Sequence, residues 1–196
     1  NLSYTETVKR MLSGDKSDGF VSPSQSINYL ECHDNYTFYD KMIYACSQDD
    51  EKTRIKKTKL SLALILLSQG VPFIHCGQEF MRTKNGLDNT YNNGSGVNDV
   101  DWERKNLISF RKEYPFLRLN DYDEINKIVK FENYYEVLVY NIANFKILIN
   151  ACAFHHLYDI DSNYRQIYSE RGCDDVRISK CVGVPEYSIV ILELID

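Results

Sequence analysis

The stretch LSQGVPFIHCGQEF, residues 67–80, carries the pattern on which the fold assignment depends. Gly70 ends an apolar, helix-patterned segment, because glycine accepts the left-handed conformation found at helix ends. Residues 71–76 then form a short apolar run typical of a buried strand, and Pro72 lies near its start, where a missing N–H costs least. The polar residues that follow indicate that this strand opens into a loop.

Similar elements extend on both sides of this stretch. We expect a strand over 27–32, a helix over about 50–68, a strand over 71–76, a loop over 77–98 and a helix over about 102–113. Ser47, Asp49 or Asp50 can cap the first helix. Strand and helix alternate, which predicts βα units with a parallel sheet buried on both faces.

From about Tyr122 the pattern changes to short β runs, with turn signals at Asn133 and Asn144. The runs cover residues 127–131, 136–141, 145–150 and 187–194. The predicted fold class is therefore α/β plus all-β. We expect a first domain over 1–121, which holds the last strands and helices of a (β/α)8 barrel, and an antiparallel β-sandwich over 122–196.

Composition is that of an ordinary globular protein. The 196 residues are 43% hydrophobic and 26% charged. Lys and Arg number 23 against 28 acidic residues, with the signs interspersed, so we expect no nucleic-acid partner. The longest apolar run, residues 60–67, is far shorter than the roughly 18 residues of a membrane span, so we expect no membrane partner. The chain begins without Met, which fits a piece of a longer protein.

Six cysteines show no CxxC pair and no close Cys/His cluster, which argues against a zinc site. Cys32 and Cys76 each end an apolar run, where a thiol behaves as a small hydrophobe. We therefore expect reduced thiols and a cytoplasmic location, with disulfides as the alternative.

Polar side chains follow both predicted strands, at the place where a strand positions a group and a loop exposes it. His33, Asp34 and Asn35 follow the first strand, and the loop after the second strand carries Arg82, Lys84, Asp88, Asn89 and Tyr91. Planar hydrogen-bonding groups beside aromatic rings suit a ligand with many hydroxyls. The alternative interpretations are a capped turn at residues 33–35 and a solvated loop over 77–98.

These segments resemble a known family. INYLECHDNYTFYDK, residues 27–41, is similar to the fourth signature region of the α-amylase superfamily (glycoside hydrolase family 13) in its type I pullulanase form. Residues 67–80, together with RTK at 82–84, NTYN at 89–92 and DW at 101–102, resemble the eighth barrel strand and loop of the same enzymes. Isoamylases usually have Gly in place of Asn35 and Asp in place of Gln78, and branching enzymes usually have Glu in place of Asn35.

The resemblance implies a glycosidase that hydrolyses α-1,6 bonds with retention of configuration. The segments that carry the nucleophilic Asp and the acid/base Glu are absent from this sequence, so we expect the chain alone to be inactive. Asp34 matches the third carboxylate, which stabilises the transition state, and His33 matches a histidine that binds the same sugar. Asn35 is its neighbour, and Arg82, Asp88, Asn89 and Tyr91 are expected along nearby glucose subsites.

The expected partners are pullulan or a branched α-glucan as substrate and the missing N-terminal barrel segment. No cofactor is required, and a calcium site is compatible with the resemblance but has no assigned ligands. Two alternatives stay open. One is a non-catalytic carbohydrate-binding module that uses sandwich tyrosines such as Tyr158, Tyr164 or Tyr168, and the other is a branching or glucanotransferase enzyme of the same superfamily.

Overall fold

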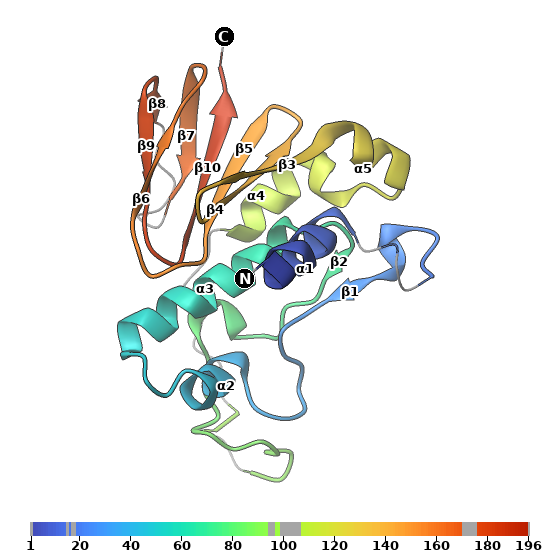
Figure 1. Ribbon diagram of the computed structural model, residues 1–196. Helices are drawn as coiled ribbons and strands as arrows, with labels where there is room; N and C mark the ends of the chain where they lie inside the picture. The colour runs from blue at the N-terminus through green and yellow to red at the C-terminus, as the bar shows by residue number, and fades with distance from the viewer. Residues whose placement is uncertain are drawn as a thin grey trace.

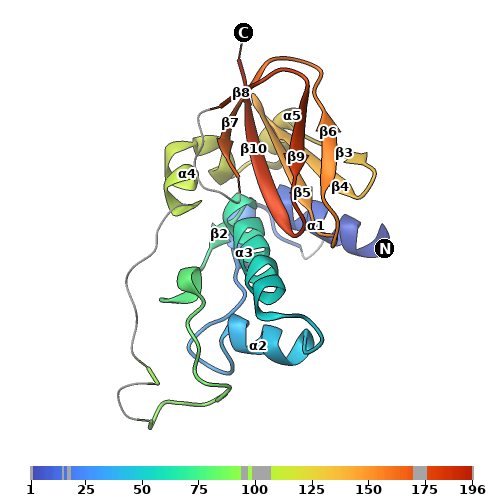
Figure 2. The same cartoon turned by 90° about the vertical axis from the view of Figure 1, so that its left-hand side faces the viewer.

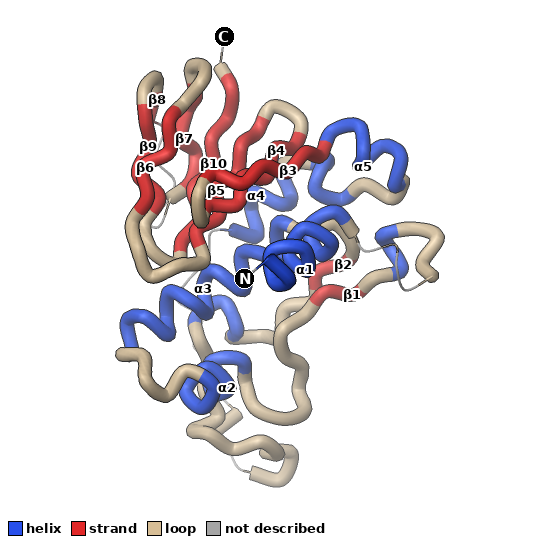
Figure 3. Tube along the Cα trace, viewed as in Figure 1, coloured by secondary structure: helices blue, strands red, loops and turns tan. Residues whose placement is uncertain are grey.

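The computed structural model describes residues 2–14, 16, 19–93, 97–98, 107–169 and 176–195. A six-stranded antiparallel sheet lies at one end, with helices packed on one face (Figure 1). Apart from one short parallel pair, the strands of the described chain follow residue 128, and Figure 3 shows them gathered at one end of the molecule.

The helical part contains one short parallel pair of strands. Its elements are α1 Leu2–Ser13, η1 Pro23–Gln25, β1 Ile27–Asn28, α2 Phe38–Ala45, α3 Glu51–Leu67, β2 Val71–Pro72, η2 Gln78–Phe80, α4 Leu107–Glu113, η3 Pro115–Arg118 and α5 Tyr122–Ile128. None of the helices in the described part of the chain is long and apolar enough to span a membrane.

The C-terminal part is antiparallel throughout, as predicted. Its strands are β3 Val129–Tyr134, β4 Val137–Ile142, β5 Phe145–Asn150, β6 His156–Asp159, β7 Tyr164–Tyr168, β8 Val176–Ile178, β9 Cys181–Val184 and β10 Ser188–Leu194. The main sheet has the order β3-β4-β5-β10-β7-β8, and β6 pairs with β9 as a separate ribbon. Apolar side chains of this ribbon, including Val182 and Val184, pack on one face of the main sheet.

Helix α3 confirms the helix predicted over 50–68. Of the three candidate caps, Asp50 is the N-cap, and its carboxylate accepts the Thr53 N–H at 2.7 Å. Leu60, Ala63 and Leu67 recur at the spacing of one helix face, and all three are buried. They belong to the same hydrophobic cluster as Ile147 in the main sheet.

The helical part and the main sheet therefore share one core. The second face of the sheet does not pack on a strand layer; it packs on α1, α3 and η3. The sandwich predicted over 122–196 therefore does not close this face by itself, because residues before Tyr122 complete its core. Figure 2 shows α3 beneath the sheet, at the lower end of the central strand β10, with which it is in contact.

The parallel pair is shorter than predicted. We expected strands over 27–32 and 71–76, but the ladder joins only Ile27 with Val71 and Asn28 with Pro72. The two strands are each other's only neighbours in this sheet of the described chain, and Ile27 and Val71 are 63% and 44% exposed. Parallel strands are normally covered on both faces. The exposure of Ile27 and Val71 therefore indicates that this pair lacks neighbouring strands and covering helices.

Several elements differ from the sequence prediction. The run predicted over 127–131 starts as a strand only at Val129, because Asp121 caps α5 by accepting the N–H groups of Asp123 and Glu124. Helices α1, α2 and α5 and the strands from β6 to β9 were not predicted from the sequence. Of the helix predicted over 102–113, residues 101–106 lie outside the described residues, and α4 begins at Leu107.

Candidate functional site

Two loops leave the carboxyl ends of the parallel pair and descend side by side toward α2 (Figures 1 and 2). The first loop covers residues 29–37, and the second begins at residue 73. Because β1 and β2 are parallel neighbours, both loops start from the same edge of the sheet. Hydrogen bonds from Lys84 of the second loop place this loop beside residues 33–35.

Lys84 fastens the two loops together. The residue is only 2% exposed, and its ammonium donates to the main-chain oxygens of His33 at 2.9 Å and Asn35 at 2.8 Å. A third contact at 3.4 Å reaches the main-chain oxygen of Asp88. Charge-assisted hydrogen bonds of this kind are stronger than neutral ones, so Lys84 holds the main chain on both sides of Asp34.

Asp40, in α2, positions Lys84. Its carboxylate is fully buried, accepts the Thr83 hydroxyl at 2.6 Å and accepts the Lys84 N–H at 2.8 Å. The Asp40 N–H in turn donates to Thr37, which caps α2. The second loop is therefore anchored on α2 through a buried carboxylate.

A second buried carboxylate joins the two segments that follow β1 and β2. Glu31 is 2% exposed, and its Oε1 lies 2.9 Å from Nδ1 of His75. Its other oxygen accepts the Phe38 N–H. This pair links the segment before His33 to the segment that follows β2, so the two loops are joined at two levels.

The predicted site residues themselves face solvent. The side chains of His33 and Asp34 are 84% and 69% exposed, and His33 Nε2 lies 3.4 Å from Asp34 Oδ1. Asn35 has a φ of 60°, a left-handed conformation that asparagine tolerates better than most residues. The turn thus presents three polar side chains on an anchored main chain, ready to bind hydroxyl groups.

The remaining predicted residues surround this turn more loosely. The Arg82 N–H donates to the Gly77 oxygen at 3.0 Å, and its side chain packs against Gly77, which has a φ of 95°. Asp88 accepts the Asn89 N–H at 2.7 Å, both side chains are exposed, and Tyr91 is 84% exposed. Among the described residues, no side-chain hydrogen bond joins residues 33–35 to any of the four predicted subsite residues, Arg82, Asp88, Asn89 and Tyr91.

Two results concern the cysteines. The five that the structure describes are free thiols. Cys76 was expected to be buried as a small hydrophobe, but it is exposed. The expectation that cysteine and histidine do not cluster is also wrong, because ligand atoms of Cys32, His33 and Asp34 lie within 4.8 Å of one another. The cytoplasmic location stays a prediction.

The tyrosines proposed as a sugar platform do not form an open surface. Tyr158 and Tyr164 are 5% and 6% exposed and belong to the core between the ribbon and the main sheet. Buried Lys146 lies 3.2 Å from the Tyr158 hydroxyl and 5.5 Å from the centre of the Tyr164 ring. Tyr168 packs against the other core. The buried rings of Tyr158 and Tyr164 cannot stack on a sugar, and Tyr168 is half-buried.

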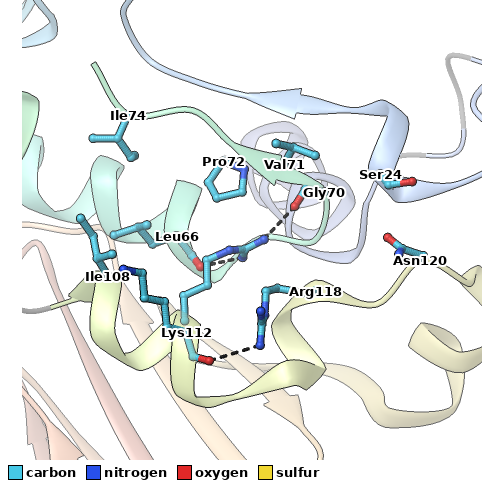
Figure 4. Close-up of a pocket in the computed structure, with 11 residues that line it drawn as sticks. Ser24, Leu66, Gly70, Val71, Pro72, Ile74, Ile108, Lys112, Arg118 and Asn120 are labelled. Atoms are coloured by element: carbon cyan, nitrogen blue, oxygen red, sulfur yellow. Dashed lines mark hydrogen bonds between the residues drawn. The ribbon is translucent and has the colours of Figure 1, made fainter. Parts of the chain in front are cut away.

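A cavity of about 500 Å³ lies between β2, α3, α4 and η3 (Figure 4). Most of its wall is apolar, including Val71, Ile74 and Ile108. Buried Arg111 is among its lining residues and donates to the main-chain oxygens of Leu66, Ser68 and Gly70 at 2.6–2.8 Å. Burial lowers the pKa of Arg111 to about 10. The cavity is lined by none of the predicted site residues.

Comparison with known proteins gives one consistent result. No family model matches the chain. A curated pullulanase of Bacillus subtilis is 36% identical over an alignment that covers 88% of this chain and 27% of that protein. An isoamylase of a Flavobacterium species is 32% identical over 49% of this chain.

Solved structures agree with the curated relatives. A crystal structure of pullulanase from an Anoxybacillus species superposes with a TM-score of 0.88 and 30% identity, and the match covers all of this chain and 31% of that one. Pullulanase of Bacillus subtilis, solved in complex with maltose, gives a TM-score of 0.85. The chain therefore spans about a third or less of the pullulanases that it matches, and the resemblance to pullulanases is confirmed.

Proposed function

Since the curated relatives and solved structures that match most or all of this chain are pullulanases, we propose that it is the C-terminal part of a pullulanase-type debranching enzyme. The substrates are pullulan and branched α-glucans, and the reaction is hydrolysis of α-1,6-glucosidic bonds with retention of configuration. The contact that carries this proposal is the anchoring of the Asp34 turn by Lys84.

Asp34 is proposed as the transition-state stabiliser. Its carboxylate accepts hydrogen bonds from two hydroxyls of the sugar at the cleavage point, and these bonds strengthen as the ring takes on oxocarbenium character. His33 and Asn35 bind hydroxyls of the same sugar. The side chains of His33 and Asp34 are exposed, and the main chain beneath them is fixed. Both features support these roles, because a preorganised group loses little freedom when substrate binds.

The second loop is proposed to supply the neighbouring glucose subsites. Arg82, Asp88 and Asn89 offer donors and acceptors for hydroxyls, and Tyr91 offers an exposed ring on which a sugar can stack. The Lys84 contacts with both loops support this arrangement, since they fix the spacing between the Asp34 turn and Asp88.

The nucleophile and the acid/base are proposed to lie on barrel segments outside this chain. Residues 1–121 then form the last part of a (β/α)8 barrel, and residues 122–196 follow as the β-sandwich domain. The exposed apolar face of the parallel pair supports this view. Tyr29 and Phe73 are 55% and 44% exposed, and their rings meet edge to face with centroids 6.2 Å apart. Strands on both sides would bury them.

The two alternatives receive less support. A binding module needs an open aromatic platform, but of the sandwich tyrosines named for that role Tyr158 and Tyr164 are buried and Tyr168 is half-buried. A branching or glucanotransferase enzyme would use the same turn with another acceptor, but a curated relative that aligns with 88% of this chain is a pullulanase.

Pullulan turnover by the longer protein tests the proposal. Asp34→Asn keeps the shape of the side chain but removes the charge, so kcat is expected to fall roughly a hundredfold or more. Asp123→Asn is the matched control, because Asp123 is also exposed but lies on α5 beside the sheet. A loss smaller than tenfold for Asp34→Asn, or an equal loss for the control, would overturn the role of Asp34. The 196-residue chain alone is expected to release no reducing sugar above a buffer control.

A further inference from the structure

We propose that Cys32, His33 and Asp34 form a binding site for a thiophilic divalent cation of the zinc type, and that this cation competes with glucan. The three residues are consecutive, and their ligand atoms lie within 4.8 Å of one another. Thiolate, imidazole and carboxylate are the three side-chain ligands that zinc takes in proteins. The competition part of this inference rests on the proposed function of His33 and Asp34.

The distances suit a tetrahedral ion. Zinc binds imidazole nitrogen and carboxylate oxygen at about 2.1 Å, so two such ligands at a tetrahedral angle lie about 3.4 Å apart. His33 Nε2 and Asp34 Oδ1 are separated by 3.4 Å. A thiolate at about 2.3 Å from the same ion would lie about 3.6 Å from either ligand. Because the ligand atoms lie within 4.8 Å of one another, Cys32 Sγ is at most about 1.2 Å farther from either ligand than this geometry requires, and rotation of the side chain can shorten both distances.

The main chain beneath these ligands is already fixed. Lys84 binds the main-chain oxygens of His33 and Asn35, on the two sides of Asp34. A rigid support of this kind lowers the entropy lost when the side chains converge on an ion. The Lys84 ammonium binds main-chain oxygens, whereas the three proposed ligand atoms belong to side chains. Lys84 therefore does not use the atoms that would bind the ion.

The site would keep one coordination position open. Cys32 is partly buried, whereas most of the surface of the His33 and Asp34 side chains faces solvent. Three protein ligands with a solvent-facing fourth position leave room for water. Binding releases the proton of the Cys32 thiol, because the thiolate is the form that ligates the metal.

The bound cation would occupy the atoms proposed to bind sugar. Nε2 of His33 and Oδ1 of Asp34 cannot ligate zinc and accept glucan hydroxyls at the same time. Zinc is therefore expected to inhibit the longer enzyme reversibly, with activity restored by a chelator. Cys32 has no place in the proposed sugar site, so its removal separates metal binding from glucan binding.

The first experiment measures metal binding without glucan. The 196-residue chain is titrated with Zn²⁺ in competition with a chromophoric chelator, and with Cd²⁺ while the ultraviolet thiolate absorption is followed. We expect one ion per chain, with Cys32→Ser weakening binding roughly tenfold or more. Asp34→Asn weakens it independently, which keeps the test valid if the serine variant does not fold. Cys76→Ser is the matched control, since Cys76 is an exposed thiol after the neighbouring strand.

Three results would overturn the inference. They are no binding by the unaltered chain, equal binding by Cys32→Ser and the unaltered chain, and loss of binding in Cys76→Ser alone. A second experiment follows pullulan hydrolysis by the longer protein with added Zn²⁺. Inhibition that is weaker in Cys32→Ser supports the competition, and equal inhibition of both proteins contradicts it. Absence of hydrolysis without zinc would refute the proposed function and leave the metal titration valid.

Discussion

The ammonium of Lys84 lies 2.8 Å from the main-chain oxygen of Asn35, and this hydrogen bond joins two loops that start 44 residues apart, at residues 29 and 73, directly after the two parallel strands. The turn at residues 33–35 therefore depends on a residue from another part of the sequence. This dependence makes Lys84 the first target for mutation.

Lys84→Met keeps the length of the side chain but leaves main-chain oxygens of both loops without their donor. Each buried acceptor that loses its partner costs about 1–3 kcal/mol, so the free energy of unfolding is expected to fall and the first loop to open to protease. Thermal unfolding and limited proteolysis measure both effects. Lys130→Met, at an exposed position of β3, serves as the control. Equal behaviour of the two variants would show that Lys84 does not anchor the loops.

Arg111 is expected to stabilise the C-terminal end of α3 and the turn that follows it. Its guanidinium donates to three main-chain oxygens, and a lysine cannot reproduce that planar arrangement. Arg111→Lys should therefore reduce the free energy of unfolding by about 1–3 kcal/mol. Denaturant unfolding checks this value. Arg118→Lys, which changes an exposed arginine with a single bond to the Lys112 oxygen, should have little effect. A similar loss in both variants would contradict the account.

The shared core predicts that the helices and the main sheet unfold together. Leu67 is 1% exposed and lies in the cluster that joins α3 to the sheet, so Leu67→Ala should cost about 2–5 kcal/mol. Circular dichroism in the helix region and tyrosine fluorescence should shift in one common transition. Leu157→Ala, at a position that is 62% exposed, is the control. Loss of helix signal while the sheet signal persists would show two independent cores.

The acid side of the stability profile should depend partly on Asp50. Its hydrogen bond with Thr53 lowers the pKa of the Asp50 carboxyl below the ordinary value of 3.8. A carboxyl whose pKa is lowered by folding stabilises the protein fully above its unfolded pKa, and this contribution is lost as the pH falls through the folded pKa. Asp50→Asn keeps a side chain that can cap a helix but does not titrate.

Thermal unfolding between pH 7 and pH 3 tests this prediction. The melting temperature of the unaltered chain should fall more steeply below about pH 4 than that of Asp50→Asn. Parallel curves for the two proteins would contradict a stabilising charge at this cap. Glu124→Gln, in the exposed first turn of α5, is a suitable control.

Local elements were predicted from the sequence where residues close together determine them. Helix α3 has a cap at Asp50 and apolar residues at helical spacing, and β4, β5 and β10 are apolar enough to be recognised. Strands such as β6 were missed because only Tyr158 of its four residues is buried. Helix α5 has only seven residues, and the capping residue Asp121 was its main local signal, so its C-terminal end was predicted as part of a strand instead.

The candidate site could be predicted only in part. His33 and Asp34 lie a few residues after β1 in the sequence, so their place in the loop that leaves this strand is a local property. The contacts that fix them are not local: Glu31 meets His75 and Asp40 meets Lys84 across 44 residues of sequence in each case. The pattern Thr37-x-x-Asp40 was the available signal for a cap at α2. No local pattern indicates that the Asp40 carboxylate would bind Lys84.

The location of glucan binding tests the central claim, that the 33–35 turn and the loop after β2 form part of a glucan site. Maltotriose is titrated into the 196-residue chain while backbone amide shifts are followed. We predict weak binding, roughly millimolar, because part of a site leaves sugar hydroxyls unpaired. The shifts should centre on residues 33–35 and 82–91 and disappear in His33→Ala. Micromolar binding centred on residues after Tyr122, unchanged by His33→Ala, would contradict the account.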